Sequence, residues 1–176
     1  MVTKTSLRDS IREDRTYKSA KKALDTIRQE FNNEEILNEL FSLQASRGVS
    51  ALSPKKILES SLKVLLNSST QEMAVRSRVT TIKMTALRSI LQLDQVIEPL
   101  RNYILINFHS QMKAEGISGV TNQRKAIDNY LKLFIREKRD LDYIIKIADL
   151  VIEDTDAAGW GLKRIQETLD QASKDR

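Results

Sequence analysis

The residues of this chain best suited to chemistry are basic side chains in its first half. Arg76 and Lys83 are seven residues apart and therefore share one face of a helix, with Thr80 between them. Lysine and arginine at such spacing can follow the phosphates of a nucleic acid backbone. The alternative is a solvated helix face opposite an apolar stripe. The predicted nucleic-acid-binding residues are Lys55, Lys56, Lys63, Arg76, Arg78, Lys83 and Arg88.

Catalytic and metal chemistry find little support in the residue pattern. The single histidine, His109, lies among apolar residues, where a structural role is the commoner one. No glycine-rich phosphate loop occurs, and no His or Cys spacing typical of a metal site. Asp149, Glu153 and Asp156 could hold a divalent cation, although such acidic runs are usually solvated. We expect a non-enzymatic protein without cofactor or metal; an all-α enzyme using the Asp149 and Glu153 carboxylates is the third alternative.

The composition bounds the fold and the setting. Only 5 of 176 residues are glycine and 2 are proline, while 30% are charged, which is typical of helices with charged surfaces and apolar stripes. The net charge of +5 favours anionic partners. Cysteine is absent, and neither a signal peptide nor an apolar run of membrane-spanning length is found. We therefore expect an all-α, soluble, cytoplasmic protein.

One long apolar stripe organises the chain between residues 70 and 115. Its members recur every three or four residues from Val75 to Phe108, which predicts one very long or once-broken helix. Ser69 with Glu72 forms a capping box and places the start of this helix near residue 70.

Pro99 interrupts this stripe and predicts a break between Asp94 and Glu98, because proline removes a backbone N–H and disfavours helical geometry before it. The segment beyond is apolar around much of its circumference, so it must be buried on several sides. A two-helix hairpin would not cover it, which indicates additional helices or subunits. The predicted partner interface comprises Leu100, Tyr103, Ile104, Phe108 and Trp160.

A second long stripe follows a turn at residues 116–119. Thr121 or Asn122 is expected to cap a helix that runs to about Glu153 in a near-heptad, coiled-coil-like pattern. A short connection between two matched stripes predicts an elongated antiparallel helical hairpin. A last short helix is expected over residues 162–171.

Smaller helices are predicted in the N-terminal third. Residues 1–30 have only a thin apolar stripe, which indicates an exposed, partly mobile helix; it is either a basic arm for nucleic acid or a solvated helix. Residues 33–66 predict two short helices, with Asn33 capping the first and Ser53 the second. These two helices are compatible with a helix-turn-helix motif. However, Glu and Ser occupy the positions at which a sequence-specific DNA-binding helix usually has Arg, Asn or Gln for contacts with bases. An ordinary helical hairpin is therefore favoured.

Three successive parts are expected: a basic N-terminal helical region (1–66), a long hairpin that forms an oligomerisation core (67–153) and a short helical tail (154–176). From Asp140 onward the charge changes sign, with acidic residues in excess. A basic front and an acidic back suit head-to-tail packing between copies.

This order of parts resembles the small terminase subunits of tailed phages. In that family the hairpin builds a ring, the N-terminal part contacts viral DNA and the tail contacts the large ATPase subunit. The resemblance implies a homo-oligomer in the host cytoplasm that packages DNA and binds a larger subunit through residues 154–176. The chain departs from the family in the second helix predicted within residues 33–66, which would have to recognise DNA but carries few basic residues. Residues 159–166 also look like the end of phage recombination mediators, which are small, helical, ring-forming and single-strand-binding.

The leading expectation is a non-enzymatic, self-associating helical protein that binds nucleic acid, DNA in particular, within a phage packaging or recombination machine. The alternative is a structural or adaptor protein of a viral or cellular assembly, whose hairpin binds another protein and whose positive charge serves only solubility.

Overall fold

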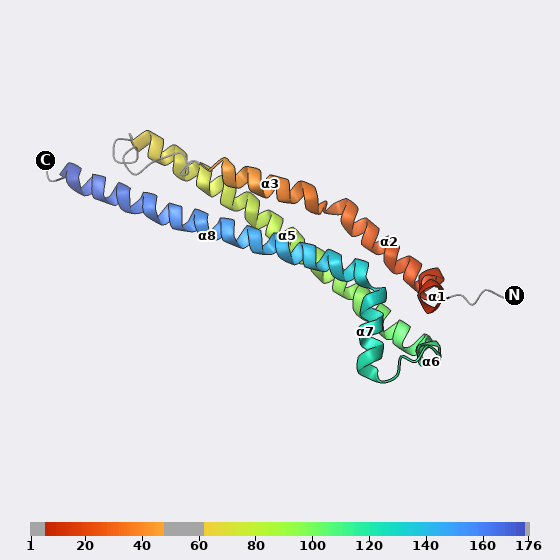
Figure 1. Cartoon of the computed structure of the whole chain (residues 1–176). Helices are drawn as coiled ribbons and strands as arrows, with labels where there is room; N and C mark the ends of the chain where they lie inside the picture. The colour runs from red at the N-terminus through yellow and green to blue at the C-terminus, as the bar shows by residue number, and fades with distance from the viewer. Residues whose placement is uncertain (1–5, 48–61, 175–176) are drawn as a thin grey trace. The chain divides into compact units, whose positions relative to one another are not determined.

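The computed structural model describes residues 6–47 and 62–174 (Figure 1). Every regular element in these ranges is an α-helix, which confirms the all-α prediction. The helices are α1 (Leu7–Glu13), α2 (Arg15–Glu30), α3 (Asn33–Ala45), α5 (Leu62–Asn107), α6 (His109–Ala114), α7 (Val120–Tyr130) and α8 (Lys132–Lys174).

The chain divides into two compact units, each built from separate stretches. Unit 1 contains residues 1–32 and 87–142, and unit 2 contains residues 33–86 and 143–176. Both long helices therefore contribute one part to each unit. The division into 1–66, 67–153 and 154–176, which was expected from the sequence, stays a prediction.

The two long helices form the predicted antiparallel hairpin. In unit 2, Arg76 and Lys83 of α5 form ion pairs with Asp156 and Asp149 of α8. The partner's number falls by seven as the number on α5 rises by seven, so the two helices run in opposite directions.

In unit 2, α3 packs against the N-terminal part of α5 and the C-terminal part of α8. The guanidinium of Arg78 on α5 donates two hydrogen bonds to the carboxylate of Glu39 on α3. The side chain of Gln71 donates to the carbonyl of Ser46, just beyond α3. The apolar core contains Leu40, Leu65, Val75, Val79, Ile82, Ala86, Ile144, Ala148, Val151 and Leu162.

In unit 1, α1 and α2 pack on the core, which corrects the expectation of an exposed N-terminal helix. Leu7, Ile11 and Leu24 are at most 2% exposed, so the thin stripe suffices to bury one side of each helix. The ring of Tyr17 packs edge-on against Phe134 of α8, with 5.9 Å between centroids. Ser6 accepts a hydrogen bond from the N–H of Asp9 at the start of α1.

Pro99 does not break α5, contrary to the prediction. The helix continues to Asn107, and the break falls at Phe108, before α6. Ile97 and Leu100, on either side of the proline, are each 2% exposed. Their burial in unit 1 holds the helical path although one backbone N–H is missing.

The second stripe also begins and ends differently from the prediction. Gly119, with φ of +81°, precedes Val120, so α7 starts without a side-chain cap from Thr121 or Asn122. The stripe is divided at Leu131 into α7 and α8. Helix α8 then continues through residues 153–161 without the expected interruption and ends at Lys174.

At the other helix starts, the capping predictions have mixed outcomes. Helix α3 begins at Asn33, close to the predicted start. Helix α5 already includes Ser69, so the capping box does not mark its start. Ser53 lies outside the described residues.

Candidate interaction surfaces

The predicted basic strip lies on α5, where three of its members are held in ion pairs within unit 2. Arg76 donates two hydrogen bonds to the Asp156 carboxylate, at 2.5 and 3.2 Å. Arg78 binds Glu39 in the same two-point manner, at 2.6 and 2.9 Å. The ammonium of Lys83 lies 2.5 Å from a carboxylate oxygen of Asp149.

These pairs change the electrostatics of the strip. Hydrogen bonds from Arg76 lower the pKa of Asp156, and hydrogen bonds from Arg78 lower the pKa of Glu39, in both cases against the opposing effect of burial. Arg76 and Arg78 therefore each face a stably ionised carboxylate. A phosphate would have to compete with that carboxylate for the guanidinium.

The other predicted phosphate contacts are scattered. Lys63 is exposed on α5 in unit 2, and Arg88 is exposed on α5 in unit 1. Arg88 forms no ion pair with any residue in the described part of the chain. Lys55 and Lys56 lie outside the described residues.

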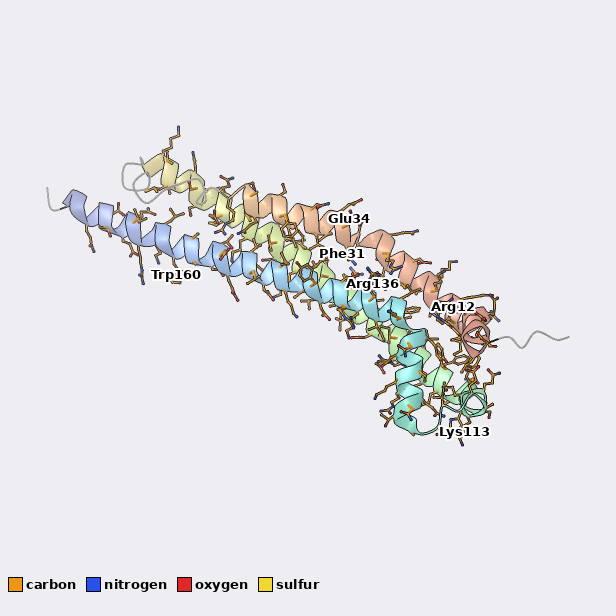
Figure 2. The ribbon with its side chains drawn as sticks, in the orientation of Figure 1. Arg12, Phe31, Glu34, Lys113, Arg136 and Trp160 are labelled. Atoms are coloured by element: carbon orange, nitrogen blue, oxygen red, sulfur yellow. The ribbon has the colours of Figure 1, made fainter. Side chains whose placement is uncertain are left out.

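A second basic surface covers α1 and α2 in unit 1. Six basic side chains lie between residues 8 and 22, against three acidic ones, and all six are exposed. Figure 2 labels Arg12 among them. We call this set the N-terminal basic surface; its members are Arg8, Arg12, Arg15, Lys18, Lys21 and Lys22.

The backbone under this surface is fixed rather than loose. The N–H of Leu7 donates to Glu115 Oε1 at 3.1 Å, which ties α1 to the segment after α6. Asp14 caps α2 by accepting from the N–H of Thr16 at 2.7 Å, and the hydroxyl of Tyr103 donates to it at 3.1 Å. Arg28, near the end of α2, reaches Glu137 of α8 at 2.5 Å.

The net charge belongs entirely to the unit that carries this surface. Unit 1 contains 17 basic and 12 acidic residues, a net charge of +5, whereas unit 2 contains 12 of each. The charge that favours anionic partners is thus found in the unit that contains α1 and α2, to which residues 7–30 contribute seven basic and five acidic residues, and it is absent from the unit that holds most of the predicted strip.

The predicted apolar interface separates into two groups. Leu100, Ile104 and Phe108 are 2%, 1% and 8% exposed and belong to the core of unit 1. Tyr103 is half-buried there. Additional helices of the same chain therefore cover this segment. Trp160 of α8, in unit 2, is 66% exposed and extends into solvent (Figure 2).

Sequence reasoning missed a buried charge cluster in unit 2. Arg47, which follows α3, is 8% exposed and donates to Glu72 Oε2 at 2.9 Å; Glu72 is 3% exposed. The same guanidinium donates to the carbonyl of Asp154 at 2.9 Å. The cluster joins α3, α5 and α8, and its only signal in the sequence is a charged residue beside a helix end.

The candidate chemical groups hold structural positions. His109 Nδ1 lies 3.2 Å from Gln123 Oε1, and Gln123, 1% exposed, also donates to the carbonyl of Ile117. Asp149 and Asp156 pair with Lys83 and Arg76. Among the described residues, no three His, Cys, Asp or Glu side chains gather as metal ligands.

Within residues 6–47 and 62–174, no helix combines the length and apolar character needed to cross a bilayer.

Comparison of the chain with protein-family models, with curated proteins and with solved structures finds no match.

Proposed function

We propose that this protein is a non-enzymatic helical protein that binds nucleic acid through the N-terminal basic surface of unit 1. The observation that carries the proposal is the set of six exposed basic side chains on the packed helices α1 and α2, in the unit that holds the whole net charge. Phosphate neutralisation by such side chains releases condensed counterions and favours binding without base recognition.

The periodicity of α2 supports this choice of surface. Arg15, Lys18 and Lys22 lie at positions i, i+3 and i+7, on one face of the helix. Tyr17 and Leu24 are buried on the opposite face. From Arg15 to Lys22 the face extends about 10 Å, and its backbone is held in place by core packing, so little conformational entropy is lost on binding.

We place the contact on α2 in preference to the strip on α5 because of the ion pairs described above. Arg76, Arg78 and Lys83 each face a carboxylate of unit 2. In the N-terminal basic surface, only Lys18 has a carboxylate partner among the described residues: Glu13, at 2.6 Å.

A matched pair of triple variants tests the proposal. The first variant changes Arg15, Lys18 and Lys22 to Gln, and the second changes Arg76, Arg78 and Lys83 to Gln, so both lose three positive charges. Binding to a short fluorescein-labelled DNA duplex is followed by anisotropy across a salt series, with single-stranded DNA and RNA of the same sequence alongside. Circular dichroism confirms that both variants remain helical.

Only the first variant is expected to bind weakly. The plot of log affinity against log salt concentration should become less steep, and its slope should fall in magnitude by about 2 to 3. Each phosphate that the variant no longer neutralises accounts for roughly 0.9 of this change. Equal losses in both variants would show that net charge alone matters, and a larger loss in the second would return the site to α5. No binding of any nucleic acid at low salt would overturn the proposal.

A packaging or recombination role is the finer form of this proposal, and it rests on the resemblance to small terminase subunits and recombination mediators. Both families form rings, so this finer role requires a native mass of many copies. A structural adaptor is the second candidate function, and the exposed Trp160 on the neutral unit is the observation that favours it.

A further inference from the structure

A second set of basic side chains lies in unit 1, on the first part of α8. Its members are Lys132, Arg136 and Arg139, at positions i, i+4 and i+7 of one helix. They therefore share one side of α8 over about 10 Å. All three are exposed, and Figure 2 labels Arg136. We call this set the α8 basic face.

Core packing fixes the direction of the α8 basic face. Phe134 and Leu141 of α8 are each 0% exposed. Leu141 lies about 180° around the helix axis from Lys132, so the three cations are on the side of α8 away from the core. The side chain of Arg28 on α2 also binds Glu137 of α8, at 2.5 Å. The helix that carries the face is thus held in place by unit 1.

The charge of the α8 basic face is only weakly compensated inside the chain. Lys132 and Arg139 form no ion pair with any residue that the structure describes. Arg136 lies 3.9 Å from Asp140, beyond hydrogen-bond distance, and the two side chains are 77% and 50% exposed. Such a pair leaves the guanidinium available to a phosphate. Asp142 is also near, about 60° around the helix axis from Arg139.

The two basic surfaces of unit 1 point away from each other. Helices α2 and α8 contact through Tyr17 and Phe134, whose rings pack edge-on. On α2, Arg15 and Lys22 lie about 160° and 140° around the helix axis from Tyr17. Lys18 lies closer to the core side, at about 100°. On α8, the basic face lies about 140° to 160° from Phe134. The two sets of cations are therefore on opposite sides of the helix pair, on the order of two helix diameters or 20 Å apart.

The surroundings of both surfaces favour duplex over single-stranded nucleic acid. Every Tyr and Phe of unit 1 lies in the described ranges and is buried or half-buried. No aromatic ring is therefore exposed beside the cations for stacking on unpaired bases. A duplex offers one phosphate charge for about every 1.7 Å of its axis, which suits binding by cations alone.

We propose that the α8 basic face binds a second duplex segment, so that one chain holds two duplexes on opposite sides of unit 1. This inference rests on the proposed function, which assigns the first duplex to the N-terminal basic surface. It adds a second site and a consequence, because a single chain then links two separate stretches of nucleic acid.

A capture assay tests this inference with the full chain. Beads that carry a biotinylated DNA duplex are mixed with a fluorescein-labelled duplex, and addition of the protein should retain the label on the beads. Titration in solution at low salt should reach two duplexes for each chain. Binding of one duplex is followed separately by anisotropy with the duplex in excess.

Two variants of α8 lose three positive charges each. The first replaces all three residues of the α8 basic face by Gln. It should reduce the captured fluorescence by at least about tenfold and lower the stoichiometry to one duplex for each chain. The control replaces three exposed cations of α8 in unit 2 by Gln: Lys146, Lys163 and Arg164. It should capture like the parent, and circular dichroism confirms that both variants stay helical.

Two results would refute the second site while leaving the proposed function intact. One is binding of a single duplex by each chain, with no label captured on the beads. The other is capture that the first variant retains, which would mean that associated copies bridge the duplexes through their N-terminal basic surfaces. Absence of any duplex binding by the parent protein would instead overturn the proposed function and this inference with it.

Discussion

Arg47 shows how a single side chain can set the arrangement of three segments. Its guanidinium donates to the Glu72 carboxylate on α5 and to the Asp154 carbonyl on α8, while its own backbone follows α3. Because both Arg47 and Glu72 are nearly inaccessible to water, a displaced helix would leave charges poorly compensated. The cluster therefore specifies how the three segments of unit 2 align.

Replacement of Arg47 by Met should destabilise the protein by about 3 kcal/mol, because a buried carboxylate loses the cation beside it. The matched control is Arg78→Met. In the ion pair between Arg78 and Glu39, the Arg78 side chain is 50% exposed and the Glu39 side chain is 33% exposed. That change should cost less than about 1 kcal/mol. Urea denaturation of both variants measures the difference, and equal costs would show that burial of Arg47 contributes nothing special.

The sequence could not reveal this cluster, since Arg47, Glu72 and Asp154 are far apart along the chain and each is ordinary in its local context. The spacing of Arg76 and Lys83, by contrast, predicted that they share one helix, and both residues do lie on α5. What spacing could not show is that Asp149 and Asp156 would be brought opposite Lys83 and Arg76.

At the scale of elements, replacement of glycine by alanine should have opposite effects on stability in α8 and in the turn before α7. Gly161→Ala should stabilise the protein by about 0.5 to 1 kcal/mol, because Gly161 is helical and its added Cβ would meet nothing within 4 Å. Gly119→Ala should destabilise it by about 1 kcal/mol or more, because φ is +81° there. Thermal or urea denaturation at low protein concentration compares them. A loss of stability in Gly161→Ala would mean that the helix is interrupted at that residue.

Helix type was predictable from sequence, whereas the breaks were not. Pro99 is a local signal for interruption, yet buried neighbours carry α5 through it. The actual breaks fall at Phe108 and Leu131, which are 8% and 0% exposed and are neither glycine nor proline. Both residues belong to the core of unit 1, and tertiary context of this kind overrides local helix propensity.

At the scale of the molecule, folding redistributes charge that looks polarised along the sequence. The acidic stretch after Asp140 and the basic stretch around Arg76 cancel within unit 2, because the hairpin brings them side by side. The basic front and acidic back seen in the sequence become one positive unit and one neutral unit.

Acid should destabilise the protein through carboxylates in both units. Burial raises the pKa of Asp14, but hydrogen bonds from Thr16 and Tyr103 outweigh it, so the pKa is lowered. The pKa values of Glu39 and Asp156 are also lowered, by hydrogen bonds from Arg78 and Arg76. Because a lowered pKa in the folded state favours the charged form, this stability is present above the unfolded pKa of about 4 and is lost as pH falls below it.

The measurement is the free energy of unfolding in urea from pH 7 down to about pH 3, the range that spans ordinary carboxyl pKa values. Glu39→Gln should be less stable than the parent at neutral pH and should lose less on acidification. Parallel curves for parent and variant would contradict a role for Glu39.

The matched spacing of the ion pairs in unit 2 also limits how this gene can change in length. Arg76 and Lys83 are separated by the same number of residues as Asp149 and Asp156, so insertion of one codon between the first two would rotate the rest of α5 by about 100° relative to α8. A compensating insertion between the two aspartates would restore the pairing. Related genes should therefore gain or lose residues in this region in both helices together.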